Sequence, residues 1–144
     1  MRFMILVKAS KESEAGQFPS AEMIATMGRF NEEMVAAGVM LAGEGLHPSS
    51  SGTRVKFAAR QRTVTEGPFP HTSELLAGFW LIRVPSREEA LAWVSRIPFA
   101  DGEEVELRRV FGAEDFTAEG MPPAEVAREQ ALRDELARRA QKPQ

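Results

Sequence analysis

Two segments of this chain are apolar on both faces of a strand, and this feature restricts its fold more than any other. In residues 2–8 the apolar side chains alternate, with Phe3, Ile5 and Val7 on one face and Met4 and Leu6 on the other. Residues 79–84 repeat the pattern. Strands of this kind lie in the centre of a sheet that is covered on both sides. The chain must therefore fold around a sheet whose two faces are both shielded from water.

A first helix is predicted between Ser20 and Gly38. Ser20 is a favourable N-cap, Glu22 lies in the first turn, and Gly38 suits a left-handed residue after the last turn. One helical stripe then collects the large apolar residues Met23, Ile24, Met27, Phe30, Met34 and Val35. This stripe is expected to pack on the sheet.

A second helix is predicted to begin at Ser86, which forms a capping box with Glu89, and to be stopped by Pro98. Its buried stripe would comprise Ala90, Leu91, Val94 and Ile97. From Pro122 onward the composition is helical but polar, with i,i+4 ion pairs at Glu129–Arg133, Asp134–Arg138 and Glu135–Arg139. This last helix is expected to lie on a surface.

A second strand is predicted to start at Val39. A separate hairpin is predicted in the sequence after it and before the strand at residues 79–84. In residues 54–60, Val55, Phe57 and Ala59 would point inward, and Thr63–Thr65 would pair with this strand across Gln61. A last strand is predicted at residues 105–108. Residues 10–19 read as a polar loop and residues 49–52 as a flexible turn.

This order of elements predicts an α+β fold, a ferredoxin-like β-α-β-β-α-β unit with an extra hairpin and a C-terminal helix. Residues 1–112 would form the domain and residues 113–144 a C-terminal extension with the polar helix. Two helices cover only one face of the sheet, and the exposed second face would be a large apolar patch. The simplest way to cover that face is a homodimer packed sheet to sheet.

Composition excludes several classes of function. The chain has 144 residues, is 43% hydrophobic and 27% charged, and carries a net charge of −3 with acidic and basic residues mixed, so no nucleic-acid partner is expected. It contains no cysteine, which removes disulfides, thiolate nucleophiles and sulfur-ligated zinc. The apolar run at the start stops at Lys8, too early for a signal peptide, and no stretch suits a membrane span. We expect a cytoplasmic protein.

Five short motifs occur in an order and spacing that resemble the YciI-related proteins of the DGPF subgroup, within the dimeric α+β barrel superfamily. The motifs lie at residues 4–7, 43–48, 65–69, 78–82 and 105–108, and the resemblance covers residues 1–112. It implies a dimer whose two sheets enclose a shared cavity, with the acidic turn around Glu66 near that cavity. It implies no cofactor.

The chain departs from this family's pattern in two places. The aspartate of the subgroup is Glu66 here, which is one methylene longer. The wider family is proposed to use a histidine on the first helix and an aspartate before the proline that ends the second helix. In this chain the first predicted helix has no histidine and Ile97 precedes Pro98, so this dyad is absent.

Seven residues are candidates for a site. Glu66, in a tight turn with Gly67 and Pro68, would be a general base or a hydrogen-bonding clamp if enclosed, or would merely cap the amides of its own turn. Histidine side chains commonly serve in acid–base catalysis, so His47 and His71 would act as its acid–base partners, or lie exposed in loops. The candidates for ligand contact are Glu44, Trp80, Phe69 and Arg54.

Two functions follow from these residues. The first is binding of a small organic ligand in a cavity enclosed by the dimer. The alternative is a cofactor-independent enzyme, of the isomerase, lyase or monooxygenase type, in which Glu66 with His47 or His71 moves a proton. No metal is expected, because Glu44, His47 and His71 lack the close spacing of metal motifs.

Overall fold

A computed structural model describes residues 1–118 and 120–140 of the chain. By its internal contacts the chain divides into two compact units, Met1–Arg109 and Val110–Gln144. The elements in chain order are β1 (Arg2–Lys8), α1 (Lys11–Glu14), α2 (Ala21–Ala36), β2 (Met40–Gly45), the 3₁₀ helix η1 (Ser49–Ser51), β3 (Thr53–Ala58), β4 (Gln61–Glu66), the 3₁₀ helix η2 (Thr72–Glu74), β5 (Leu76–Arg83), α3 (Arg87–Val94), β6 (Val105–Val110), α4 (Ala113–Ala118) and α5 (Pro123–Ala140).

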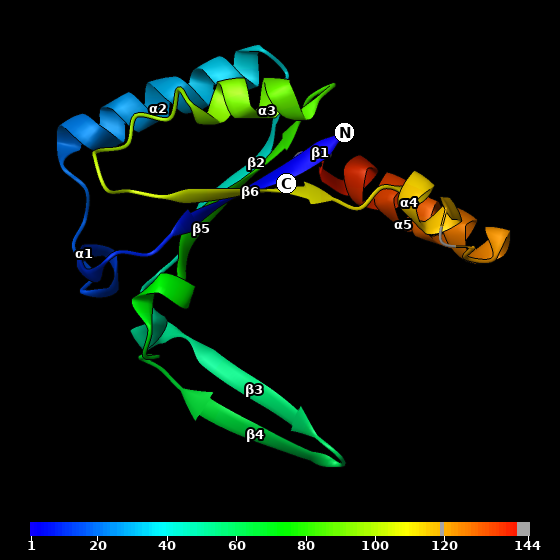
Figure 1. Ribbon diagram of the computed structural model, residues 1–144, viewed down its shortest axis with the longest axis horizontal. Coiled ribbons are helices and arrows are strands. Elements are labelled where there is room, and N and C mark those ends of the chain that lie inside the picture. The colour runs from blue at the N-terminus through cyan, green and yellow to red at the C-terminus, as the bar shows by residue number, and fades with distance from the viewer. Residues whose placement is uncertain (119, 141–144) are drawn as a thin grey trace. The chain divides into compact units, whose positions relative to one another are not determined.

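The central sheet confirms the predicted ferredoxin-like fold. Its strand order is β2-β5-β1-β6, and β5 pairs antiparallel with both β1 and β2. The two strands that are apolar on both faces, β1 and β5, therefore lie in the middle (Figure 1). In their register Ile5 pairs with Trp80 and Phe3 with Ile82, so these side chains share a face.

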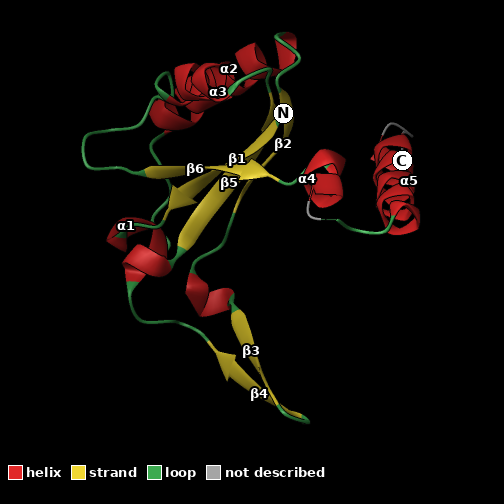
Figure 2. Ribbon diagram, turned by 45° about the vertical axis from the view of Figure 1, so that its right-hand side comes forward, coloured by secondary structure: helices red, strands yellow, loops and turns green. Residues whose placement is uncertain are grey.

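Helices α2 and α3 lie together on one face of this sheet (Figures 1 and 2). The core forms between them and consists of Phe3, Ile5, Phe30, Met34, Val39, Trp80, Ile82, Val84 and Ala90, all of them buried. Alternation along the strands turns a second set of residues, Met4, Leu6, Phe79 and Leu81, to the other face. We call this second face the open face. Its four residues are only half-buried.

Both predicted N-cap serines are confirmed, and at Ser86 this is one half of the predicted capping box. The Ser20 side chain accepts a hydrogen bond from the backbone N–H of Met23, and Ser86 accepts one from Glu89, each at 3.1 Å. Gly38 has a φ of +69°, as expected for a left-handed residue that ends α2. Helix α3 differs in length, because it ends at Val94 with Ser95 as its C-cap, before Pro98. Leu91, predicted to be buried, is 40% exposed.

Two loops are more ordered than the sequence predicts. Residues 10–19 contain the short helix α1, which begins with a reciprocal capping box between Ser10 and Ser13. Residues 49–51, predicted as a flexible turn, form η1 and hydrogen-bond to two other segments. A capping box of two serines was missed because it lacks the usual Glu or Gln at its third position.

The predicted hairpin is present as β3–β4, but its turn and its burial differ. The turn is formed by Ala59 and Arg60, and Ala59 has a φ of +48°. Val55 and Phe57 were expected to point inward, yet they are 45% and 71% exposed. The prediction that they are buried was wrong, because alternation identifies a face of the hairpin but not whether anything covers it.

The second unit is a pair of helices. The rings of Phe111 and Phe116 are in contact, tilted by 34° with their centroids 5.7 Å apart. The ion pairs Glu129–Arg133 and Glu135–Arg139 form on α5 as predicted. The predicted pair Asp134–Arg138 is replaced, since Arg138 contacts Glu135 and Asp134 accepts from Gln130.

The predicted extension, residues 113–144, includes residue 119 and residues 141–144, which lie outside the described residues. In the part of the chain that is described, helices are too short or too polar to span a membrane.

Candidate functional site

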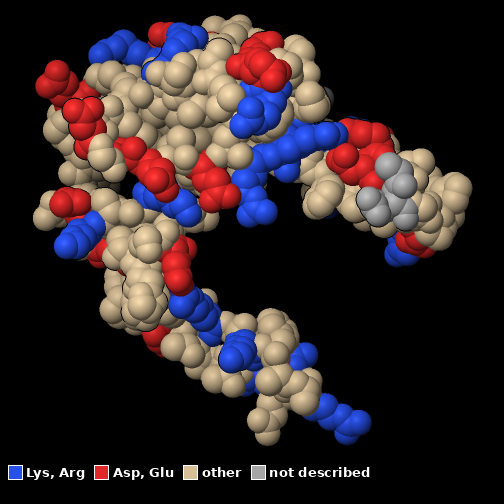
Figure 3. Space-filling view, viewed as in Figure 1, with Lys and Arg blue, Asp and Glu red and all other residues tan. Residues whose placement is uncertain are grey.

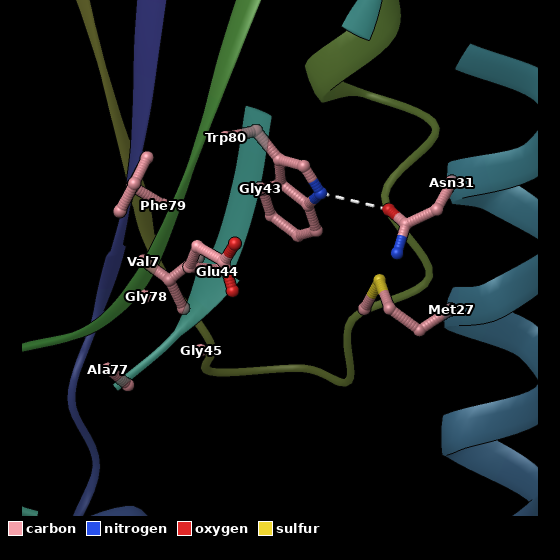
Figure 4. Close-up of a pocket in the computed structure, with 10 residues that line it drawn as sticks. All are labelled: Val7, Met27, Asn31, Gly43, Glu44, Gly45, Ala77, Gly78, Phe79 and Trp80. Carbon is pink, nitrogen blue, oxygen red and sulfur yellow. Dashed lines mark hydrogen bonds between the residues drawn. The ribbon is translucent and has the colours of Figure 1, made fainter. Parts of the chain in front are cut away.

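A pocket of about 220 Å³ lies between helix α2 and the sheet. It is formed where β2 ends and β5 begins, and Figure 4 shows its lining: Val7, Met27, Asn31, Gly43, Glu44, Gly45, Ala77, Gly78, Phe79 and Trp80. The volume is below the range of about 300–1,000 Å³ that is typical of drug-sized ligands. A single small ring is the size of molecule that such a space accepts.

Trp80 forms one wall of the pocket. Its indole N–H donates a 2.9 Å hydrogen bond to Oδ1 of Asn31 on α2, and Phe79 points to the other side of the strand (Figure 4). Phe30 packs edge-on against Trp80, with the ring centroids 6.2 Å apart. The indole is therefore held in place by both a hydrogen bond and an aromatic contact.

The hydrogen bond to Trp80 also orients the Asn31 amide. Because Oδ1 accepts from the indole, the donor group Nδ2 is the part of the side chain left to face other molecules. Asn31 is not among the seven residues predicted from the sequence. One feature of the sequence could have pointed to it: Asn31 is a polar residue four positions after Met27 on the apolar stripe of α2. A polar side chain on a buried stripe needs a hydrogen-bond partner.

Glycines on β2 and β5 leave room for the pocket. A Cβ at Gly43 would lie 2.7 Å from Cδ1 of Trp80, and a Cβ at Gly78 would lie 2.7 Å from the carbonyl oxygen of Glu44, so neither position accepts a side chain. Gly45 differs, because a Cβ there would meet no atom within 4 Å. The Gly43-Glu44-Gly45 sequence thus brings the backbone close to Trp80 while it keeps the pocket mouth open.

Glu44 is an exposed residue at the rim of this pocket. It pairs in register with Phe79 near the end of β2, an edge strand of the sheet. Of the seven candidates from the sequence, Glu44 and Trp80 are the two that share the pocket.

Glu66 lies elsewhere, at the base of the hairpin. It is exposed, and its carboxylate accepts a 2.8 Å hydrogen bond from the hydroxyl of Thr53, its partner in the register of β3 and β4. His47 and His71 are also exposed, and His71 has a left-handed backbone with a φ of +65°. Within residues 1–118 and 120–140, hydrogen bonds do not join Glu66 to either histidine.

The turn after Glu66 forms a junction with η1 and α1. The Ser49 hydroxyl donates a 2.5 Å hydrogen bond to Glu14 and accepts one of 3.0 Å from the backbone N–H of Phe69. The Ser49 backbone N–H also donates to Glu14, at 3.0 Å. A Cβ at Gly67 would lie 1.7 Å from the Ser49 carbonyl oxygen, so only glycine fits there. The Gly67–Pro68 peptide bond is cis.

Arg54 and Phe69, two of the predicted ligand contacts, contact each other. The Arg54 guanidinium lies 4.0 Å from the centroid of the Phe69 ring, a cation–π arrangement. This contact joins the base of β3 to the turn, beside the Ser49 junction.

Comparison with protein families matches this chain to a known domain. The model of the YCII-related domain covers residues 1–114. This chain belongs to the YCII-related domain family. The resemblance to YciI-related proteins predicted from the sequence is thereby confirmed, and the match spans the whole of the YCII-related domain's sheet and both helices that cover it.

This chain is also similar to a solved structure. This is 5-chloro-2-hydroxyhydroquinone dehydrochlorinase (TftG) from Burkholderia phenoliruptrix AC1100, in complex with 2,5-dihydroxybenzoquinone. It is 16% identical in sequence, the likeness covers 80% of this chain and 98% of that chain, and the TM-score is 0.46. No curated protein matches the chain. Among the described residues, groups of His, Asp and Glu that could hold a metal ion are absent.

Proposed function

We propose that this protein binds a small organic ligand with one ring in the pocket between α2 and the sheet. The observation that carries the proposal is the pairing of an apolar wall with two polar groups of opposite kind. Trp80, Val7 and Met27 provide the apolar wall and Asn31 offers a fixed donor, while Glu44, which is paired with Phe79 on the edge strand β2, is an acceptor at the rim. Few oriented polar groups in an apolar pocket are the usual basis of small-ligand specificity.

This pocket differs in place from the cavity expected between two sheets, because Trp80 faces α2 and Phe79 faces the open face. Ligand binding between Trp80 and α2, with Glu44 at the rim, therefore needs only one subunit. The homodimer remains part of the proposal, since the open face carries Met4, Leu6, Phe79 and Leu81 and would be covered by a second copy. Light scattering of the protein as it elutes from a size-exclusion column measures its molar mass and so tests the homodimer.

Tryptophan fluorescence measures ligand binding at this pocket directly. The chain has two tryptophans, so Trp93→Phe leaves Trp80 as the only reporter, and Trp80→Phe leaves Trp93 as the matched control. Phenols with a single ring are the probes, each compared with its methyl ether. We expect phenols to change the Trp80 signal and to bind more tightly than the ethers, because only the hydroxyl donates a hydrogen bond to Glu44.

Gly45→Val tests whether the pocket itself is the site. The new side chain meets open space, so the fold should be unaffected, but it narrows the pocket and should weaken phenol binding by roughly tenfold or more. Glu44→Gln keeps the shape and should remove the preference for phenol over ether. Unchanged affinity in both variants, or equal affinity of phenols and ethers for the parent protein, would contradict the proposal.

Catalysis by Glu66 with His47 or His71 stays the alternative that the sequence predicts. Its test is independent of the pocket: Glu66→Gln would abolish turnover of a substrate while Gly45→Val would leave it intact. Phe69 and Arg54 would then be the ligand contacts beside that site.

A further inference from the structure

The β3–β4 hairpin is a two-stranded sheet without cover in the described part of the first unit. Every residue of β3 and β4 is exposed. In the register Val55 pairs with Val64, and Phe57 lies two residues further on, so the three side chains share one face. We call Val55, Phe57 and Val64 the apolar hairpin face. They are 45%, 71% and 60% exposed.

An isolated two-stranded hairpin is at best marginally stable in water, because its strands bury little apolar area. Three large apolar side chains on one side add exposed area that soluble proteins usually avoid. The hairpin therefore requires contact with another surface to be a stable element.

The base of the hairpin is fixed, so the hairpin points in a defined direction. The Gly67 N–H donates a 2.8 Å hydrogen bond to the carbonyl of Gly52, and the Phe69 N–H donates to the Ser49 hydroxyl. Figures 1 and 2 both show the hairpin on the side of the sheet away from α2 and α3. This is the side of the open face, where Met4, Leu6, Phe79 and Leu81 lie.

The hairpin is also basic in an acidic chain. Residues 53–66 hold four of the 18 basic residues and one of the 21 acidic residues, and Figure 3 shows Lys and Arg atoms along the hairpin. The rest of the first unit, residues 1–52 and 67–109, has 9 basic and 13 acidic residues, a net charge of −4. The part of the chain that complements this hairpin in charge is therefore the rest of the first unit.

We propose that the hairpin is an arm that clasps a second copy of this chain. The apolar hairpin face packs against the first unit of the other copy, and the four basic side chains of the hairpin lie near its acidic side chains. In a symmetric dimer each copy gives one arm and receives one. The inference rests on the proposed homodimer and adds the element that stabilises this dimer.

Zero-length cross-linking between carboxylates and lysines tests the arm directly. Lys56 is the lysine on the hairpin, and mixing ¹⁴N and ¹⁵N protein separates links between copies from links within one. We expect mixed-isotope links from Lys56 to acidic residues in the 1–52 or 67–109 segments. A dimer in which Lys56 forms links only within one chain, or none, overturns the arm.

A pair of matched variants measures how much the arm contributes. Phe57→Ser with Val64→Ser should raise the dimer dissociation constant by roughly tenfold or more in sedimentation, because two apolar side chains lose their contact. The control is Phe18→Ser with Ile24→Ser, which are also exposed, at 89% and 54%, and lie outside the hairpin. The control should leave the constant unchanged.

The outcomes separate the two proposals. If the parent protein is a monomer at micromolar concentration, the homodimer fails and the arm fails with it. If the parent is a dimer and the hairpin variant dissociates no more than the control, the arm alone fails. Hairpin amides that gain protection from hydrogen exchange only when duplex DNA or anionic vesicles are added would also overturn it, because the arm requires protection by protein concentration alone.

Discussion

Ser49 shows, at the scale of single residues, how a side chain in a short loop can connect three segments that are distant in sequence. Its partners Glu14 and Phe69 lie 35 residues before it and 20 residues after it. The contacts hold α1, η1 and the turn after Glu66 together. This junction is the base from which the hairpin projects.

Replacing Ser49 by alanine should lower the free energy of unfolding by about 2 kcal/mol, because the Phe69 N–H and the Glu14 carboxylate both lose a partner. Urea unfolding followed by circular dichroism measures the change. Ser51→Ala, an exposed neighbour on the same 3₁₀ helix, should change it by less than about 0.5 kcal/mol. Equal effects of the two substitutions would mean that the junction does not stabilise the fold.

Gly67→Ala should be more damaging, since the new methyl group would lie 1.7 Å from the Ser49 carbonyl oxygen. The loop must shift to accept it, and overpacking of this kind costs about 3 kcal/mol. The same urea experiment applies, with Gly45→Ala as the control that meets open space. An unchanged unfolding midpoint for Gly67→Ala would show that the two backbones are not in contact.

At the scale of elements, the parts that depend on local patterns were predicted well. Helix α2 and strand β1 appear at the predicted residues, because periods of 3.6 and 2 and the capping serines are local properties. Strand β5 was predicted at residues 79–84 and spans Leu76–Arg83, so its start was placed three residues too late. Helix α1 and η1 were missed, because neither has an apolar stripe and both are stabilised by particular side-chain hydrogen bonds. The exposure of β3 was missed because periodicity carries no information about cover.

Helix α2 contains Gly28, and replacing this glycine should stabilise the helix. A Cβ at this position meets no atom within 4 Å, so Gly28→Ala should stabilise the protein by about 1 kcal/mol through helix propensity alone. The midpoint of urea unfolding should rise with an unchanged slope. Ala25→Gly, at an exposed position of the same helix, should produce the opposite shift, and a destabilising Gly28→Ala would imply a packing role for this glycine.

At the scale of the whole molecule, all nine buried residues of the core cluster lie within the first unit. The sheet does too, apart from Val110, the last residue of β6. A chain that ends after Gly112 should therefore keep the far-ultraviolet spectrum of an α+β domain and unfold in one cooperative transition. Hydrogen exchange of β1 and β5 amides gives the sharper measurement. Loss of slow exchange in these two strands would show that the second unit is needed for folding.

The candidate site was predicted only in part. Glu44 and Trp80 were selected from the sequence and do line one pocket, but Asn31 completes it from α2, and the Trp80–Asn31 bond joins residues 49 positions apart. Glu66, His47 and His71 were grouped because of their chemistry, and the fold places Glu66 beside Thr53 instead. Chemistry can select residue types, whereas their distance in space depends on strand register.

The sequence by itself determined which residues share a face, where α2 and α3 begin, and that the chain is a ferredoxin-like unit of the YciI type. The shared faces and the helix starts follow from short periods and from capping groups a few residues apart, whereas the YciI type follows from the resemblance carried by five motifs. Only the tertiary structure decided that Trp80 faces α2, that Ser49 meets Glu14 and Phe69, and that the hairpin stands clear of the sheet. The physical reason is that such contacts depend on how whole elements pack. A local pattern shows which residues of an element share a face, but not which other element covers that face.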